Sequence, residues 1–313
     1  MIIVAVVLFL VGLVLIIKGS DVFVDASLWV SDATGVSKVV IGATLVSFAT
    51  TAPEFFVSTI AVIKGHNDMS VGNAVGSISA NLGLAFALLA LLAPGIIKDR
   101  GFSTKGLTMI FATVALTIFC VGGRIAIWEA FVLIAIFALS IYMNIRGAKE
   151  PEVPAPRRQI PRKEILINVA KFVGGAAGLI LGSNILVDNG TVIAEFFGMP
   201  EEIIGLTFVA IGTSLPELFT SITAIIKKQS ALSIGNVFGA NIIDTTLILA
   251  TAGFITKGNL EVTEEAASFH LPLAVLLMVV ATLPTALGKK IFRWQGGVMI
   301  GIYVVYLVFL AVQ

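Results

Sequence analysis

The sequence predicts an all-α membrane protein of ten transmembrane helices, arranged as two inverted repeats of five. Of its 313 residues, 58% are hydrophobic and only 12% charged, with a mean hydropathy of +1.04, whereas soluble domains carry about 25% charged residues. The apolar residues form stretches of about 20, enough to cross a bilayer as a helix. Since they do not alternate with polar residues as in a β-barrel, helices are what satisfies the backbone in lipid.

The apolar stretches are divided by a central polar segment. They lie at residues 2–30, 38–63, 69–96, 106–122, 127–145, 165–194, 203–226, 231–256, 268–288 and 296–312. The first lacks the basic segment and cleavage motif of a signal peptide, so we expect a retained helix. The segment RGAKEPEVPAPRRQIPRKE, rich in proline and charge, follows the fifth. It predicts a solvated linker at 147–163 between a first half, 1–146, and a second half, 164–313.

The basic residues orient the chain. About 15 of the 20 lysines and arginines fall on the linker's side of the ten-span arrangement, and about three fall opposite. Because basic loops stay in the cytoplasm, we expect a cell-membrane protein with a cytoplasmic linker and both termini outside. The net charge of +1 gives no reason to expect a nucleic-acid partner. The single cysteine, Cys120, can form no intrachain disulfide. The expected partner is the lipid bilayer, and the sequence indicates no cofactor and no obligate protein partner.

The second half repeats the first. A shift of 163 positions aligns residues 19–84 with 182–247 without a gap, and about 22 of the 66 positions are identical, which indicates a duplicated unit. Because each half contains an odd number of spans, the second copy crosses the membrane in the opposite direction. Inverted repeats are typical of secondary transporters, whose substrate site lies near the midplane where the repeats meet.

Two glutamates lie near the centres of the second and seventh stretches. Glu54 and Glu217 are 163 positions apart and are therefore repeat mates. A charge at that depth costs about 2.5–3.5 kcal/mol, so two of them require a reason. Each follows a proline, in ATTAPE and GTSLPE, and a proline frees a backbone carbonyl about one turn earlier. The nearby hydroxyls belong to Thr50, Thr51, Thr213 and Ser214.

The third and eighth stretches carry a second pair of polar sets. These are Gly72, Asn73, Gly76, Ser77 and Asn81 in the first copy, and Gly235, Asn236, Gly239, Ala240 and Asp244 in the second. The glycines form small faces that let a neighbouring helix approach closely. Ser77 and Asn81 share a helix face, and Asp244 adds a third acid at the mate of Asn81. A purely structural interpretation stays open for all three acids, in which the side chains are protonated and make structural hydrogen bonds.

Carboxylate, amide, hydroxyl and carbonyl oxygens without nearby histidine or cysteine favour a hard cation, and Ca²⁺ fits best. One Ca²⁺ neutralises two glutamates, as do two Na⁺ or two protons, so the loads compete. That competition predicts an antiporter and not an enzyme. A channel with the acids as its selectivity ring is an alternative. An intramembrane hydrolase is less expected, because His66 and His270 are isolated near span ends and are interpreted as solvated loop residues.

These motifs resemble the calcium/cation antiporter superfamily, and specifically its prokaryotic sodium/calcium exchanger branch. The resemblance covers essentially the whole chain and rests on SFATTAPEFFVS with GNAVGSISANLGL and on AIGTSLPELFTS with GNVFGANIIDTTL. It implies a ten-helix fold whose second, third, seventh and eighth spans form the ion-binding core. The first and sixth spans would be a long, tilted pair that slides across this core to alternate access.

The resemblance also implies a set of ligands. Glu54 and Glu217 would be the principal Ca²⁺ ligands, and the remaining members would be Thr50 and Thr213 at the Ca²⁺ site, Ser47, Ala210, Thr51, Ser77 and Ser214 at flanking Na⁺ sites, and Asn81 and Asp244 at the centre. The chain departs from the family in two places: ATT stands where GTS is common, and Ala240 stands where a serine is expected. The lost hydroxyl favours H⁺ as the counter-ion, whereas the glutamate motifs favour Na⁺; we favour Na⁺ slightly, and Asp244 leaves K⁺ co-transport open.

Overall fold

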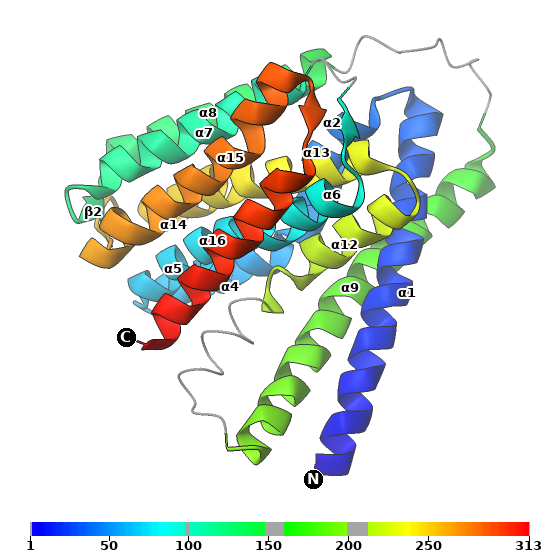
Figure 1. Cartoon of the computed structure of the whole chain (residues 1–313), viewed down its shortest axis with the longest axis horizontal. Coiled ribbons are helices and arrows are strands. Elements are labelled where there is room, and N and C mark those ends of the chain that lie inside the picture. Colours follow the sequence, from blue (N-terminus) through cyan, green and yellow to red (C-terminus); the bar gives the residue numbers. More distant parts are fainter. Residues whose placement is uncertain (1, 98–100, 148–159, 199–211, 313) are drawn as a thin grey trace.

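The computed structural model describes residues 2–97, 101–147, 160–198 and 212–312, which are mainly helical (Figure 1). The helices of the first half are α1 (Ile2–Thr34), α2 (Lys38–Ile41), α3 (Ser47–Thr50), α4 (Ala52–Ile63), α5 (Asn67–Ala80), α6 (Ala87–Leu92), α7 (Phe102–Cys120) and α8 (Ile127–Gly147). Those of the second are α9 (Arg162–Phe196), α12 (Leu215–Ile226), α13 (Ser230–Ile242), α14 (Leu249–Ile255), α15 (Leu271–Gly288) and α16 (Arg293–Val312). Within the described residues, four π-helical segments continue them: η1 (Gly42–Val46), η2 (Asn81–Phe86), η4 (Ile243–Ile248) and η5 (Ala266–His270).

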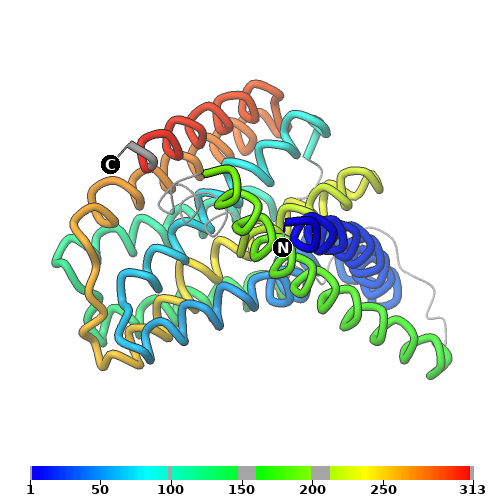
Figure 2. Tube along the Cα trace, turned by 90° about the horizontal axis from the view of Figure 1, so that it is seen from below, coloured from blue at the N-terminus to red at the C-terminus, as the bar shows by residue number. Residues whose placement is uncertain are grey.

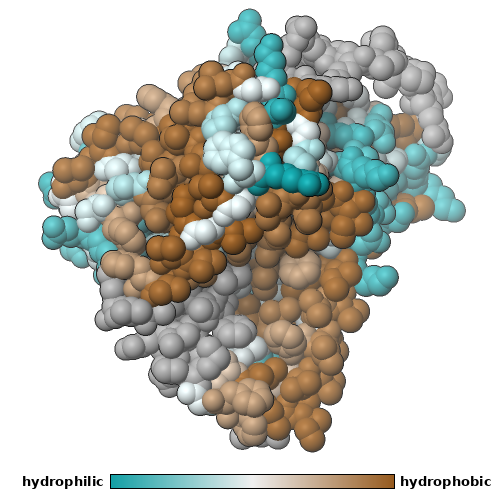
Figure 3. All heavy atoms as spheres, in the orientation of Figure 1, coloured by the Kyte–Doolittle hydropathy of each residue, from teal (hydrophilic) through white to brown (hydrophobic). Residues whose placement is uncertain are grey.

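The described helices include eight that are long and apolar enough to cross a membrane, and the bent pair Lys38–Thr50 and Ala52–Ile63 can provide another crossing. Apolar side chains cover much of the surface seen in Figure 3, whereas hydrophilic residues gather toward its upper and left edges. This distribution places the apolar surface against lipid, so the chain is a multi-pass membrane protein. Of the predicted seventh stretch, residues 203–211 lie outside the described part, and ten spans remain a prediction.

The predicted end of the third stretch is wrong. The third stretch stops being helical at Leu92, because Gly95–Ile96 forms strand β1, which pairs antiparallel with β4 (Lys290–Ile291). Strand β2 (Arg124–Ile125) pairs in the same way with β3 (Leu260–Glu261). The sequence did not predict these two-residue pairs, which close loops between helices. Helix α9 begins at Arg162; residues 148–159 of the predicted linker lie outside the described part, and its bounds stay a prediction.

The two longest helices, α1 and α9, lie side by side (Figures 1 and 2). Their contact is made by glycines. A Cβ on Gly12 would lie 2.8 Å from the backbone nitrogen of Leu186, and a Cβ on Gly182 would lie 2.9 Å from the carbonyl oxygen of Gly12. Gly19 and Gly175 face each other in the same way. Because Gly12 and Gly19 are the repeat mates of Gly175 and Gly182, the interface relates the two halves by the same offset as the sequence.

Helix α13 packs closely against the first part of the bent pair. A side chain on Gly235 would overlap the carbonyl oxygen of Val39, and one on Gly239 would reach Ala43 and the hydroxyl of Ser47. The small face predicted for the eighth stretch is therefore a helix contact. The aromatic rings of Phe86 and Phe238 stack beyond it, 5.8 Å apart, in the largest buried cluster. This packing holds α13 and the bent pair against each other, where the polar motifs lie.

Candidate functional site

The two proline motifs produce the same break in the backbone. Thr51 has φ −82° and ψ 2°, and its repeat mate Ser214 has φ −87° and ψ 4°. A new helix starts directly after each, α4 and α12, with proline in its first turn because proline tolerates that position and has no N–H to donate. Glu54 and Glu217 lie in the first turns of these helices. Helix N-termini favour a carboxylate through their free N–H groups and dipole.

All three predicted acids are fully buried. Glu54, Glu217 and Asp244 each have 0% of their surface exposed, and the three carboxyl groups lie near enough to interact electrostatically. Asp244 begins the polar part of η4, and its mate Asn81 begins η2, so both copies place a π-helical segment at the same position. Such segments often mark functional sites. The Asn81 Nδ2 donates to Asp244 Oδ2 over 3.5 Å, which brings the two mates into contact.

Hydrogen bonds also cross between the copies at the breaks. Thr50 Oγ1 donates to Asn236 Oδ1 over 3.2 Å, and Thr213 Oγ1 donates to Asn73 Oδ1 over 3.4 Å. These are the same bond in the two copies, because both the threonines and the asparagines are 163 positions apart. Thr51 Oγ1 donates to Glu217 Oε1 over 3.0 Å.

Several buried oxygens around these contacts have no hydrogen-bond partner among the described residues. They are Glu54 Oε1 and Oε2, Glu217 Oε2, Asp244 Oδ1, Asn81 Oδ1, Ser77 Oγ and Ser214 Oγ. A buried polar group without a partner costs about 1–3 kcal/mol, and a charged one costs more. No group of three or more histidine, cysteine, aspartate or glutamate residues in the described chain is placed to hold a metal alone. A cation here must therefore draw on neutral oxygens as well as carboxylates.

Comparison with known proteins gives the family. The model of the family described as sodium/calcium exchanger protein matches residues 4–146 and 167–312. This chain belongs to that family. It is 29% identical to the sodium/calcium exchanger MaX1 of Methanosarcina acetivorans over 96% of this chain and 97% of that one. It is also 29% identical to the putative antiporter CaxA of Alkalimonas amylolytica, over 97% of each chain.

The solved structures of the sodium-calcium exchanger NCX_Mj resemble this family member closely. A structure of NCX_Mj soaked with Na⁺ and Sr²⁺ has a TM-score of 0.86 and 28% sequence identity, over 98% of this chain and 99% of that chain. A structure soaked with Na⁺ and Ca²⁺ has a TM-score of 0.85. The fold of this chain is therefore the exchanger fold.

Among the predicted site residues of this exchanger-family member, the structure brings Thr51 to Glu217 and Asn81 to Asp244, and the carboxyl groups of Glu54, Glu217 and Asp244 near one another. The two expected backbone ligands differ from these. Ala210 lies outside the described residues, and the carbonyl of Ser47 already accepts hydrogen bonds from the Thr51 nitrogen (2.9 Å) and from Thr50 Oγ1 (3.4 Å). Ala240 is fully buried in α13. The serine hydroxyl that the family pattern leads one to expect at this position would therefore lie in the protein interior.

Sequence reasoning named Asn73 and Asn236 only as polar residues of the third and eighth stretches, without a role. The structure shows that they are the partners of the two threonines. Asn73 Nδ2 also donates to the carbonyl of Glu54 over 3.2 Å and to Ser58 Oγ over 3.0 Å. Their role could have been predicted from the offset of 163 positions that they share with Thr50 and Thr213. His270 was also misplaced: it belongs to η5, with its side chain only 17% exposed and 3.6 Å from Glu265.

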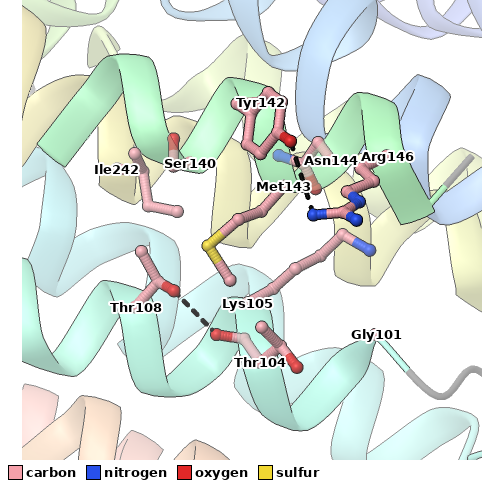
Figure 4. A pocket seen from close by; sticks show the side chains of 10 residues that line it. All are labelled: Gly101, Thr104, Lys105, Thr108, Ser140, Tyr142, Met143, Asn144, Arg146 and Ile242. Atoms are coloured by element: carbon pink, nitrogen blue, oxygen red, sulfur yellow. Dashed lines mark hydrogen bonds between the residues drawn. The ribbon is translucent and has the colours of Figure 1, made fainter. Parts of the chain in front are cut away.

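A cavity of about 400 Å³ lies between α7 and α8 and contains none of the predicted ligands (Figure 4). Lys105 and Arg146 line one end of it, and the Arg146 guanidinium donates to the Tyr142 hydroxyl over 3.4 Å. No acidic side chain is among the residues that line it. The candidate cation site is therefore the group of buried oxygens around Glu54, Glu217 and Asp244, and not this cavity.

Proposed function

We propose that this protein is a secondary antiporter that exchanges Ca²⁺ for Na⁺ by alternating access at a site built on Glu54 and Glu217. The observation that carries the proposal is the pair of buried carboxylates. Three of their four oxygens have no hydrogen-bond partner among the described residues. Ionised carboxylates in that state are costly to bury. A bound cation removes the cost, so the site favours a loaded state over an empty one.

The stoichiometry of charge explains the coupling. Two ionised glutamates carry two negative charges, which one Ca²⁺ or two Na⁺ neutralise. Either load satisfies the same oxygens, and both together overfill them. Reorientation across the membrane is then inexpensive with one load or the other and expensive with neither. The sodium/calcium exchanger MaX1 and the ions soaked into NCX_Mj, Na⁺ with Ca²⁺ or Sr²⁺, support these cargoes.

We assign the remaining oxygens to the two ions as the resemblance to the exchanger family implies. The Ca²⁺ site takes Glu54 and Glu217 with oxygens of Thr50 and Thr213. Asn81 and Asp244 lie at the centre, where their side chains meet. The proposed Na⁺ ligands are Thr51, Ser77, Ser214, Ser47 and Ala210. Support for this set comes from Ser77 and Ser214, whose buried hydroxyls have no partner in the described structure.

We also propose ten spans in two inverted halves, 1–146 and 164–313, with the 147–163 linker in the cytoplasm and both termini outside the cell membrane. The two strand pairs support this arrangement. It places the loops that contain β1 and β4 on the linker side and those that contain β2 and β3 on the opposite side, and these are the strands that pair. The matched breaks at Thr51 and Ser214 support the repeat.

A second candidate, exchange of Ca²⁺ for H⁺ on the same carboxylates, is favoured by Ala240. Na⁺ needs several oxygens in addition to the glutamates, and the alanine removes one that the first copy supplies at Ser77. Protons need only the carboxylates. The putative antiporter CaxA shows that relatives of similar length are not all named as sodium exchangers.

Calcium-45 uptake into proteoliposomes tests both functions, with an outward Na⁺ gradient and a pH gradient imposed separately. We expect uptake with the Na⁺ gradient and its loss in Glu54→Gln. Glu129→Gln is the matched control, because Glu129 is a glutamate of α8 whose Oε2 accepts from the Ala126 nitrogen at 2.7 Å. Uptake driven by the pH gradient alone would establish the second candidate. Absence of uptake with either gradient, or full uptake in Glu54→Gln, would refute the proposal.

A further inference from the structure

A cluster of charged residues joins α1 to the end of α12, outside the carboxylate site. Lys227 Nζ lies 2.6 Å from Asp21 Oδ1 and 2.5 Å from Asp25 Oδ1, and it also donates to the Asp21 carbonyl over 3.2 Å. The hydroxyls of Ser20 and Thr223 share a hydrogen bond of 2.8 Å beside it. These contacts tie the two helices together at the end of α12 that the proposed topology places on the linker side.

Lys227 keeps its positive charge, but the ion pair contributes little free energy, so the contact can break and form again. Burial lowers the pKa of Lys227, but the hydrogen bonds and negative charges of Asp21 and Asp25 outweigh burial and raise the pKa above its ordinary value. The lysine therefore stays protonated at neutral pH. The side chains of Lys227, Asp21 and Asp25 are 22%, 52% and 58% exposed, and water weakens pairs of that exposure.

The repeat supplies a second lysine and one of the two aspartates. Lys64 is the mate of Lys227, and Asp188 is the mate of Asp25, whereas the mate of Asp21 is Asn184. Both are exposed, and neither makes an ion pair within the described residues. The helices that carry them also differ from their mates: α1 packs along α12, but no comparable contact joins α9 to α4 in the described structure.

Two-fold symmetry relates these two sets. An axis in the membrane plane exchanges the halves and the sides, so a contact between α1 and α12 on the linker side corresponds to one between α9 and α4 on the opposite side. The site has the same asymmetry. Thr51 donates to Glu217, whereas the mate hydroxyl of Ser214 and the mate carboxylate of Glu54 have no partner among the described residues. One half is closed by contacts that the other half could make and does not.

We propose that these two sets are alternating latches. Lys227 with Asp21 and Asp25 holds the linker side shut in the conformation described here. Lys64 with Asp188 holds the opposite side shut in the other conformation, after α1 has left α12 and α9 has moved onto α4. The latch proposal rests on the proposed antiporter function, because only a transporter that alternates access visits both conformations.

Cross-linking of cysteine pairs tests the latches in protein whose Ca²⁺ uptake has been measured, with Cys120→Ala as the background. The pairs are Asp25→Cys with Lys227→Cys, and Lys64→Cys with Asp188→Cys. A short bifunctional methanethiosulfonate is used to join them. The long lysine side chain lets an ion pair form between backbones that are too far apart for a direct disulfide. We expect both pairs to cross-link, each to stop uptake, and reductant to restore it.

Charge-neutralising variants provide a second measurement that does not depend on the linker. Lys227→Gln is expected to raise the Lys64→Cys with Asp188→Cys yield about two- to fivefold, the range for loss of a partly exposed ion pair. Lys64→Gln is expected to raise the Asp25→Cys with Lys227→Cys yield similarly. Lys228→Gln is the matched control, because Lys228 lies in the same turn, is exposed and makes no ion pair with a described residue.

Two results would overturn the latches while leaving the antiporter intact. One is a protein that takes up Ca²⁺ but never cross-links at Lys64→Cys with Asp188→Cys. The other is a Lys227→Gln effect no larger than that of Lys228→Gln. Absence of Ca²⁺ uptake in the unmodified protein, with either gradient, would instead refute the proposed function itself.

Discussion

The glycine contact between α1 and α9 allows a sharp test, because two adjacent glycines of α9 have opposite surroundings. A Cβ on Gly175 would lie 2.7 Å from the backbone nitrogen of Phe23, 2.8 Å from its Cα and 2.9 Å from the carbonyl oxygen of Gly19. A Cβ on Gly174 would have nothing within 4 Å. Gly175→Ala should therefore push the helices apart, and Gly174→Ala should not.

The size of the effect follows from these distances. Ordinary contacts of a Cβ begin at 3.4 Å, so α1 and α9 must separate by about 0.5–1 Å, and overpacking of this kind costs about 1–3 kcal/mol. Both variants also gain about 0.5–1 kcal/mol because alanine is the better helix former. The difference in the free energy of unfolding between the two variants cancels that gain and leaves the steric cost.

Thermal unfolding in detergent, followed by size-exclusion chromatography, measures the difference. At about 2–4 °C per kcal/mol for chains of 150–250 residues, Gly175→Ala should melt about 2–12 °C below Gly174→Ala. We also expect slower Ca²⁺ uptake with an unchanged half-saturating Ca²⁺ concentration, because the contact lies away from the carboxylates. Equal melting temperatures would refute the close backbone contact as the reason for Gly175.

Three further predictions concern single side chains. Asp244→Asn should keep calcium-45 uptake with less than about a tenfold change in half-saturating Ca²⁺, because Glu54 and Glu217 already supply two charges; complete loss would make Asp244 a required ligand. Ala240→Ser should lower the Na⁺ concentration that half-inhibits Ca²⁺ binding by about two- to tenfold, as one added hydroxyl contact allows, and an unchanged value would remove this position from the Na⁺ site. Cys120 is 1% exposed, so the native protein in vesicles should resist maleimide, and rapid labelling would contradict its burial.

Much of the fold could be predicted because lipid restricts the sequence strongly. Long apolar stretches can satisfy the backbone there only as helices, and the predicted α1, α7, α8, α9 and α16 lie where the hydropathy placed them, within a few residues. The two-residue strand pairs could not be predicted this way. Their pairing of Gly95–Ile96 with Lys290–Ile291 depends on loops that are far apart in the chain and not on any local pattern.

The candidate site was predictable to the extent that it is duplicated. The offset of 163 identified Glu54 with Glu217, and it also contained the bonds from Thr50 to Asn236 and from Thr213 to Asn73, which became visible only with the structure. Local spacing could not find them, because each bond joins one copy to the other across 186 or 140 residues. The backbone role expected of Ser47 depends on which carbonyls are already paired, and that too is decided by the folded chain.

The two copies differ in the contacts that close them, and this difference could not be predicted from the sequence. The bonds that join each threonine to the asparagine of the other copy are the same in both halves, so they form a symmetric framework around the site. The contacts that differ are Thr51 with Glu217 against Ser214 with Glu54, together with the α1 contact to α12 against that of α9 to α4. Both copies carry a hydroxyl and a glutamate at the differing contact, Thr51 with Glu217 and Ser214 with Glu54, so this difference belongs to the conformation. A site whose halves carry matching hydroxyls and glutamates but are differently closed can exchange their states at little cost in free energy, which is what alternating access requires.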